Sequence, residues 1–143
     1  MRVLNECMEA ETTPVKRVMS TELFRIAPDA TAQTAAKTLL TQGIGSLLVV
    51  DRDGELAGIV TSTDLIEVVS GEGSPTESTV REHMTTDVVT IGATDSVHDA
   101  AVEMIRGDIQ HLPVTGDESD IVGMASATDI TTQMTYMGSS GTD

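Results

Sequence analysis

The chain has 143 residues, and its 23 acidic side chains outnumber eight basic ones to give a formal net charge of −15. This negative charge argues against nucleic acid or an anionic membrane as a partner, because both are polyanions. Aromatic residues make up only 1% of the chain, which removes the stacking surfaces that single-stranded nucleic acid needs, and no apolar run reaches the roughly 18 residues of a membrane helix.

The numbers of cysteines and lysines indicate where in the cell, and at what salt concentration, the protein works. The single cysteine, Cys7, cannot form an internal disulfide, and the sequence shows no signal peptide, so a cytoplasmic protein is predicted. An acidic surface with abundant threonine and only two lysines is typical of a salt-adapted (halophilic) protein, such as one from an archaeon, because high salt screens self-repulsion. An ordinary acidic protein is the alternative.

The first half of the chain predicts one small unit after a polar start. Residues 1–13 carry apolar side chains at the spacing of one helical face, which fits either a linker helix or a frayed terminus. Beyond Pro14 the pattern predicts a strand over 22–26, an amphipathic helix over 31–42 that ends at Gly43, and strands over 46–50 and 56–60 joined by a turn at 51–54. A second helix is predicted from Asp64.

The second half repeats this order after a linker. Residues 71–78 hold two glycines, one proline and no apolar side chain. A helix then opens at Ser96 with a capping-box-like pattern, a more acidic hairpin turn follows at 116–120, and a closing helix is predicted from about Ile130. The tail over 138–143 is predicted to be disordered.

The stretch from Gly58 to Asp64 predicts a strand that runs directly into a helix. Thr61 and Asp64 are residue types that cap a helix and fill its first turn. Such a junction directs free N–H groups and the positive end of the helix dipole at one point, which suits a phosphate. Asp64 could accept hydrogen bonds from a ribose diol, and Gly58 would let a ligand or a neighbouring backbone approach closely. The alternative is a capped helix with no ligand.

The junction occurs twice. Gly123, Ser126 and Asp129 repeat Gly58, Thr61 and Asp64 at an offset of 65 residues, and the offset holds without a gap along both halves. Each copy is shorter than most free-standing domains, so the copies are expected to bury their apolar faces against each other.

The two copies resemble CBS domains, and the chain resembles a tandem CBS pair, or Bateman module. The residues that carry the resemblance are Val18–Thr21 and His83–Thr86, Gly43–Asp51 and Ile109–Val114, and the two Gly-x-x-Thr/Ser-x-x-Asp endings. The resemblance implies an α+β fold in which each repeat has a three-stranded sheet with two helices, the repeats being related by pseudo-two-fold symmetry. The implied division is an extension over 1–13, one CBS domain over 14–71, a linker over 72–78, a second CBS domain over 79–137 and a tail over 138–143.

The resemblance also implies a site for an adenosine-containing ligand in each repeat. Thr61 and Ser126 would contact phosphate, and Asp64 and Asp129 would hold the ribose hydroxyls. The remaining expected ligand-binding residues are Thr21, Gly45, Ser46, Gly58, Thr86, Gln110, His111 and Gly123. Since the repeat places His111 opposite Ser46, the two sites should differ.

Few cations are available to meet a phosphate. Lys16 and Arg81 occupy equivalent positions in the repeat and are the candidate phosphate partners, with solvated surface charge as the alternative. No zinc-like spacing of Cys and His appears, and no nucleophile is framed by a matched base and acid. No metal, no required cofactor and no catalytic residue are therefore predicted.

The favoured function is regulatory rather than enzymatic. The module would bind AMP, ADP, ATP or S-adenosylmethionine and signal its occupancy to a separate effector protein. The resemblance further implies a homodimer, a disc of four CBS repeats. A structural dimerisation module with degenerate, unoccupied sites is the alternative.

Overall fold

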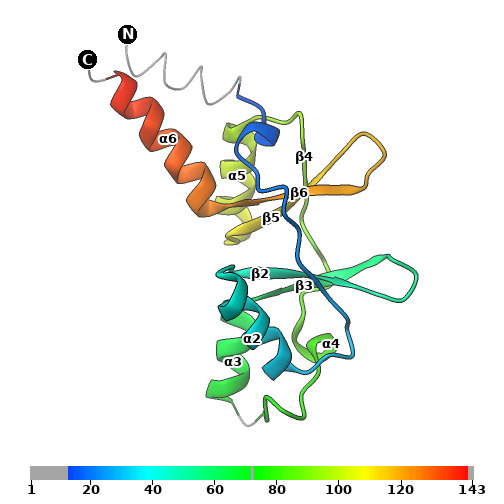
Figure 1. Ribbon diagram of the computed structural model, residues 1–143. Helices are drawn as coiled ribbons and strands as arrows, with labels where there is room; N and C mark the ends of the chain where they lie inside the picture. Colours follow the sequence, from blue (N-terminus) through cyan, green and yellow to red (C-terminus); the bar gives the residue numbers. More distant parts are fainter. Residues whose placement is uncertain (1–12, 72, 142–143) are drawn as a thin grey trace. The chain divides into compact units, whose positions relative to one another are not determined.

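The computed structural model describes residues 13–71 and 73–141, and the chain forms two compact units (Figure 1). The first-repeat unit is Leu23–Val88. The second-repeat unit is Val89–Asp143 together with the segment that ends at Glu22. The helical face expected over residues 1–13 and the unpaired Cys7 lie outside the described residues, apart from Thr13.

The first-repeat unit is a three-stranded sheet with two helices packed together against it. Strands β1 (Arg25–Ile26), β2 (Ser46–Val50) and β3 (Leu56–Thr61) lie in the order β1-β2-β3, with β1 parallel and β3 antiparallel to β2. Helices α2 (Ala32–Gln42) and α3 (Ser62–Ser70) lie side by side, and a short α4 (Val80–His83) follows. Leu47, Val49 and Val60 of the sheet are fully buried among residues of these helices.

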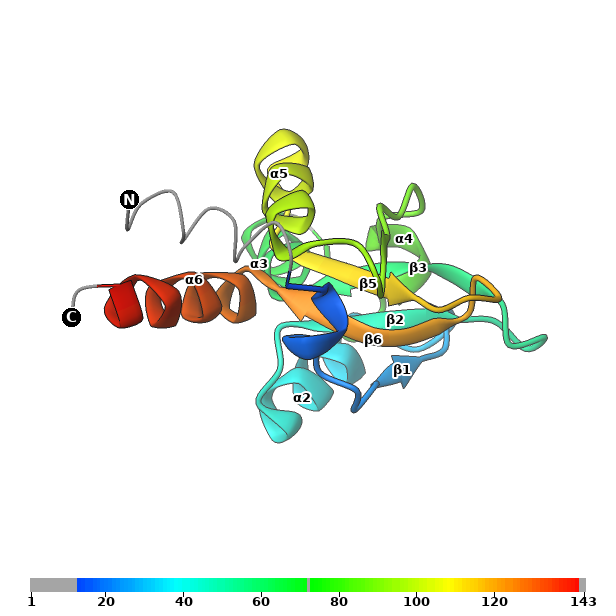
Figure 2. The ribbon, with the colours of Figure 1, turned by 90° about the horizontal axis from the view of Figure 1, so that it is seen from above.

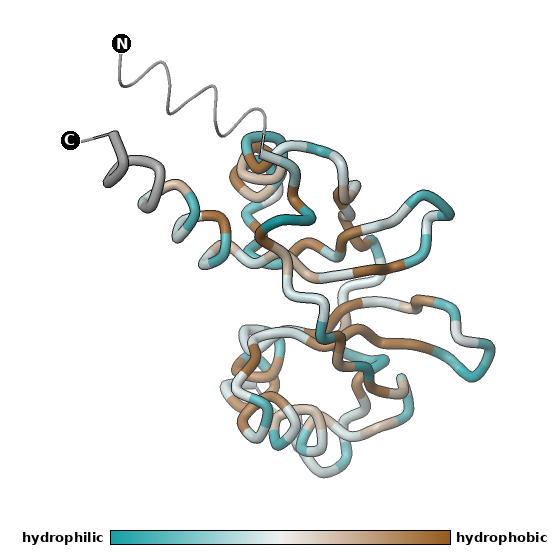
Figure 3. Tube along the Cα trace, turned by 45° about the horizontal axis from the view of Figure 1, so that its top comes forward, coloured by the Kyte–Doolittle hydropathy of each residue, from teal (hydrophilic) through white to brown (hydrophobic). Residues whose placement is uncertain are grey.

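The second-repeat unit has the same order of elements. Strands β4 (Ile91–Gly92), β5 (His111–Thr115) and β6 (Ile121–Ser126) form the sheet, with helices α5 (Val97–Gly107) and α6 (Ala127–Gly141) and a 3-10 turn η1 (Val15–Arg17). Val15, Leu112 and Val114 are fully buried in its core. The prediction of two three-stranded sheets with helices, an α+β chain, is confirmed. Figure 3 shows the same pattern in hydropathy, with apolar strand centres and hydrophilic hairpin turns.

The segment that leads into each repeat packs against the other repeat. In the second-repeat unit Ser20 pairs with Met124, and the Val15 N–H donates to the Asp95 carbonyl at 2.8 Å. In the first-repeat unit Thr85 pairs with Ile59 in the same way. Each segment that precedes one repeat in the sequence therefore pairs, through an isolated β-bridge, with the last strand of the other repeat's sheet.

The predicted linker is part of the first-repeat unit. The backbone N–H groups of Ala32 and Gln33, in the first turn of α2, donate to the carbonyls of Ser78 and Pro75, each at 2.9 Å. These two donors would otherwise lack a partner at the helix start. The chain therefore uses the linker to complete the start of α2.

Several element boundaries differ from the sequence prediction. Helices α3 and α6 begin at Ser62 and Ala127, before the predicted starts at Asp64 and about Ile130. Strand β1 has only two residues, where the apolar pattern suggested five. Helix α6 continues to Gly141, past the predicted end before Gly138 (Figure 2). No proline interrupts it, and a glycine lowers helix stability by only about 1 kcal/mol. None of the described helices is long and apolar enough to cross a membrane.

Helices α2 and α5 begin alike and end differently. Thr31 and Ser96 accept hydrogen bonds from the N–H groups of Thr34 and Asp99, as expected for N-caps. At the other end the left-handed position is Gly43 in α2, with φ +66°, and Asp108 in α5, with φ +51°.

Replacing Asp108 by glycine is expected to raise the free energy of unfolding by about 0.5–1 kcal/mol. Glycine adopts this backbone conformation without the strain of a side chain, and the change removes a negative charge from the negative end of the helix dipole. Urea unfolding checks the result, with Asp108→Asn as a control that removes only the charge. A decrease in stability for Asp108→Gly would contradict the left-handed backbone conformation of residue 108 at the end of α5.

Candidate functional site

The strand–helix junction of the first-repeat unit is a closed capping box. The Thr61 N–H donates to Asp64 Oδ2 at 2.9 Å, and the Thr61 hydroxyl lies 3.1 Å from the same oxygen. In return the Asp64 N–H donates to Thr61 Oγ1 at 3.4 Å. Thr61 caps α3 in this way and ends β3 at the same residue. The predicted pair of hydroxyl and carboxylate is therefore held in one fixed arrangement.

Two more predicted residues lie at this junction. Ser46, which is buried, pairs with Thr61 across the β2–β3 ladder. The Ser62 N–H donates to the Gly45 carbonyl at 3.0 Å. The structure thus brings Gly45, Ser46, Thr61 and Asp64 together from the ends of two strands and the start of α3.

The second-repeat unit repeats the arrangement with different side chains. The Ser126 N–H donates to Asp129 Oδ2 at 3.0 Å, and the Asp129 N–H donates to Ser126 Oγ at 3.1 Å. His111 pairs with Ser126 across the β5–β6 ladder, and the Ala127 N–H donates to the Gln110 carbonyl at 2.8 Å. The predicted residues Gln110, His111, Ser126 and Asp129 therefore form one cluster.

The two predicted glycines are explained by a neighbouring backbone. A Cβ on Gly58 would lie 2.6 Å from the Thr85 carbonyl oxygen and 2.9 Å from Met84 Sδ. A Cβ on Gly123 would lie 2.4 Å from Met19 Sδ and 2.9 Å from the Ser20 carbonyl oxygen. Thr86 and Thr21, the residues next along these segments, are exposed. Their contact with a ligand, like that of the glycines, stays a prediction.

Lys16 and Arg81 lie at the opposite end of the sheet from the junctions. The Arg81 N–H donates to the Pro28 carbonyl, just beyond the Val50 end of β2, whereas Thr61 pairs at the Ser46 end. The Lys16 N–H donates to the Ala93 carbonyl, which occupies the same place in the second-repeat unit. Four residues of strand, about 13 Å, separate the two ends of β2.

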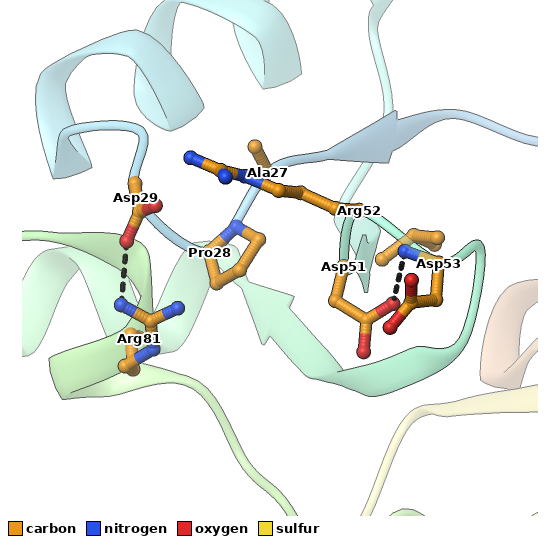
Figure 4. A pocket seen from close by; sticks show the side chains of 8 residues that line it. Ala27, Pro28, Asp29, Asp51, Arg52, Asp53 and Arg81 are labelled. Atoms are coloured by element: carbon orange, nitrogen blue, oxygen red, sulfur yellow. Dashed lines mark hydrogen bonds and ion pairs between the residues drawn. The ribbon is translucent and has the colours of Figure 1, made fainter.

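Arg81 instead lines a hollow of about 430 Å³ in the first-repeat unit (Figure 4). Its guanidinium is paired with the Asp29 carboxylate. Arg52 extends across Ala27 and away from Asp53, as Figure 4 shows. The sequence offered no signal for this hollow, because it is lined by three separate segments, 27–29, 50–53 and Arg81. Among residues 13–71 and 73–141, no three acidic, His or Cys side chains gather as metal ligands.

His111 has a shifted pKa in the second-repeat cluster. Burial lowers its pKa from 6.5, and the Asp129 carboxylate opposes that shift only in part. The imidazole is therefore predominantly neutral in the folded protein at neutral pH.

The shift at His111 predicts a pH-dependent stability. Since the unfolded chain binds the proton more readily, the stability contribution is complete above pH 6.5 and falls as the pH is lowered through the folded pKa. Replacement by serine, the residue at the equivalent position 46, should flatten this slope. Urea unfolding between about pH 7.5 and 5.5, above the usual titration of carboxylates, measures it in both proteins. If stability depended on pH equally in the original chain and in the His111→Ser variant, the lowered pKa of His111 would be contradicted.

The comparisons with known proteins agree on one family. Residues 15–71 and 80–135 each match the CBS domain. An uncharacterised 17.7 kDa protein of Acidianus ambivalens is 29% identical over 118 residues, which are 82% of this chain and 71% of the relative. L-aspartate semialdehyde sulfurtransferase of Methanocaldococcus jannaschii is 30% identical over 129 residues, but the match covers only 25% of that enzyme.

A solved structure has the same fold as this chain over almost its whole length. It is the CBS domain pair of protein MJ0100 in complex with 5′-methylthioadenosine and S-adenosyl-L-methionine. The TM-score is 0.80 at 29% identity, with 87% of this chain and 98% of that chain covered. Together with the two matched segments, this shows that the chain belongs to the CBS domain family and contains two CBS domains.

Proposed function

We propose that the chain is a regulatory module that binds an adenosine-containing ligand at its strand–helix junctions and signals occupancy to a partner protein. The ligand classes considered are AMP, ADP, ATP and S-adenosylmethionine. A ligand of this kind changes a signal only if its affinity differs between two arrangements of the protein.

The observation that carries the proposal is the duplicated capping box. In each unit the capping bonds go to Oδ2 of the aspartate, and Oδ1 takes no bond among the described residues. Both aspartates are half-buried. A half-buried carboxylate oxygen held in place by the helix start is a suitable acceptor for ribose hydroxyls. The ligands of the related MJ0100 pair, both adenosines, support the same assignment.

The proposal assigns no catalytic activity to this chain. The sulfurtransferase relative is about four times the length of the matched segment, and its activity belongs to that whole protein. We place the module in the cytoplasm, where nucleotides and S-adenosylmethionine are available.

A thermal-shift panel tests the proposal. Adenosine, 5′-methylthioadenosine, S-adenosylmethionine, AMP, ADP and ATP are compared in matched salt, since a ligand that binds only the folded state raises the melting temperature. At least one should raise it, and its 2′,3′-dideoxy analogue, which lacks the diol, should not. No shift with any of the six would contradict the proposal.

A second candidate function, dimerisation, has its own observation. Three large apolar side chains are exposed on the packed helices of the first-repeat unit: Leu40 (84%), Ile66 (65%) and Val69 (71%). Ile105 and Met134 are exposed on the equivalent helices of the second-repeat unit. We propose that these helix faces form the contact of a homodimer, a disc of four CBS repeats, because exposed apolar groups of this size favour a partner surface.

The double variant Leu40→Asp/Ile66→Asp is expected to weaken the dimer at least about 100-fold. Each lost apolar side chain costs about 1.5–3 kcal/mol of burial, and 1.4 kcal/mol is a factor of ten. Sedimentation equilibrium measures the mass with and without ligand. Lys37→Asp, a charge change on α2, serves as the control, and an unchanged monomer–dimer equilibrium in the double variant would contradict the interface.

A further inference from the structure

We propose that the hollow of the first-repeat unit binds a free α-amino acid, with its carboxylate facing Arg52 and Arg81 and its ammonium facing the Val50 carbonyl. The hollow has a volume of about 430 Å³, which is within the range of small-molecule sites. It is separate from the strand–helix junction of the same unit, which lies at the other end of β2, about 13 Å along the strand.

The pairing of β1 with β2 ends one residue earlier than the equivalent pairing of β4 with β5. In the second-repeat unit the last pair is Gly92 with Thr115, and the Ala93 N–H donates to the Thr115 carbonyl at 2.9 Å. In the first-repeat unit the last pair is Ile26 with Val49, which is one position sooner by the repeat offset. The two strands therefore separate earlier at this end of the first-repeat sheet.

A proline accounts for the early separation. The repeat offset places Pro28 at the position of Ala93 and Val50 at the position of Thr115. Proline has no N–H, so Pro28 cannot donate to the Val50 carbonyl. Both residues line the hollow. The hollow thus contains a backbone acceptor without the donor that the second-repeat unit supplies, which favours a ligand that brings an N–H group of its own.

Arg52 supplies a cation without an ion-pair partner. It stands between Asp51 and Asp53 in the hairpin turn but pairs with neither, nor with any other residue in the described part of the chain. Asp51 Oδ1 instead accepts from the N–H groups of Asp53 and Glu55, at 2.9 and 3.0 Å. The Arg52 side chain extends across Ala27 (Figure 4). A guanidinium in this position can bind a carboxylate through two parallel hydrogen bonds.

The second guanidinium is only weakly engaged. Arg81 is paired with Asp29, but the two side chains are 58% and 66% exposed. An ion pair this exposed contributes little, so a ligand carboxylate can share Arg81. The Arg81 N–H donates to the Pro28 carbonyl at 2.9 Å, which fixes its backbone at the hollow. Figure 4 shows both guanidinium groups on the side of Asp29, with Asp51 and Asp53 on the other side.

The charges around the hollow favour a zwitterion over an ion of either sign. Two arginines and three aspartates line it. A phosphate would meet these carboxylates and the long-range field of a chain with a net charge of −15, and a simple cation would meet the guanidinium groups. A zwitterion has no net charge, and its ammonium can donate to the Val50 carbonyl and to the carboxylate of Asp53. An α-amino acid carries the ammonium and the carboxylate on a single carbon.

The second-repeat unit does not have the same side chains. The repeat offset places Asp117 at the position of Arg52, and Thr94 at the position of Asp29. The arrangement of an unpaired guanidinium beside an unmatched carbonyl is therefore assigned to the first-repeat unit alone.

NMR titration of the unaltered chain with the standard free L-amino acids tests the inference. At millimolar concentration at least one should shift the amide signals of residues 29, 51–53 and 81 saturably, while those of the junction residues 61–64 stay in place. Two analogues of that amino acid are then compared: the α-hydroxy acid, which lacks the ammonium, and the amino alcohol, which lacks the carboxylate. Each should bind at least about tenfold more weakly, because a hydrogen bond to a charged group is lost. No saturable shift with any amino acid, or an analogue that binds as tightly, overturns the inference.

Two substitutions by the residues of the second repeat separate the contacts. Arg52→Asp removes the free cation and should weaken binding at least about tenfold. Pro28→Ala restores an N–H for the Val50 carbonyl and should weaken binding several-fold. Lys37→Asp makes the same charge change on α2, outside the hollow, and should bind as the original chain does.

Undiminished affinity in the folded Arg52→Asp or Pro28→Ala protein overturns the inference, as does an equal loss in Lys37→Asp. Binding of adenosine ligands should be the same in all three variants as in the original chain. Failure of the amino-acid site therefore leaves the proposed function intact.

Discussion

Replacing Gly123 by alanine is expected to lower the free energy of unfolding by about 1–3 kcal/mol. The new Cβ would lie 2.4 Å from Met19 Sδ and 2.9 Å from the Ser20 carbonyl oxygen. The methionine side chain can move, but the carbonyl belongs to Ser20, whose backbone pairs with Met124. Relieving the overlap therefore costs some packing and weakens this backbone pairing. Urea unfolding gives the change in free energy.

Gly107 offers a matched control in the same unit. It is exposed in α5, and the nearest atoms to its Cβ position are side-chain atoms of Ile109 at 3.4 Å. Gly107→Ala should therefore be neutral or stabilising, by up to about 1 kcal/mol. In a double-mutant cycle, Met19→Ala should relieve part of the cost of Gly123→Ala. A Gly123→Ala protein as stable as the original would contradict the close approach of residues 19–20 to β6.

Asp64→Ala and Asp129→Ala are expected to weaken ligand binding, each in its own unit. A hydrogen bond to a charged group contributes about 1.5–3 kcal/mol, so each change should weaken its site by roughly 10- to 150-fold. Each variant also loses a capping interaction, at about 1 kcal/mol of stability. Calorimetric titration with the best ligand of the panel measures both affinity and stoichiometry.

The control for this experiment removes the same charge away from the junction. Glu67 is exposed on α3 and takes no part in the capping box, so Glu67→Ala should bind ligand as the original chain does. Asp64→Asn keeps an acceptor for the Thr61 N–H and tests the charge separately. If the folded double variant Asp64→Ala/Asp129→Ala binds with undiminished affinity, the aspartates do not hold the ligand.

The order of the elements and the capping chemistry were predictable from local sequence. Thr61 and Asp64 stand three apart at the start of an apolar period, and that spacing fixes which hydrogen bonds a helix start can make. The repeat then extended the prediction to Ser126 and Asp129. The order of the elements and the capping hydrogen bonds depend on residues close together in the sequence. Residue pattern and spacing are therefore enough to predict them.

The exchange of leading segments was not predictable in the same way. Because the two copies match without a gap, residues 19–20 would fit beside either β3 or β6 as far as the pattern shows, and only the packed chain pairs Ser20 with Met124. The positions of Lys16 and Arg81 depend on that same tertiary choice. The hollow, assembled from three distant segments around Arg52 and Arg81, left no periodic signal either.

A crystal structure of the protein with its tightest-binding adenosine ligand tests the central claim most directly. We expect the ribose hydroxyls to lie within hydrogen-bond distance of the carboxylate oxygens of Asp64, of Asp129 or of both, with the capping boxes intact. Ligand bound at saturating concentration but away from both aspartates would contradict it.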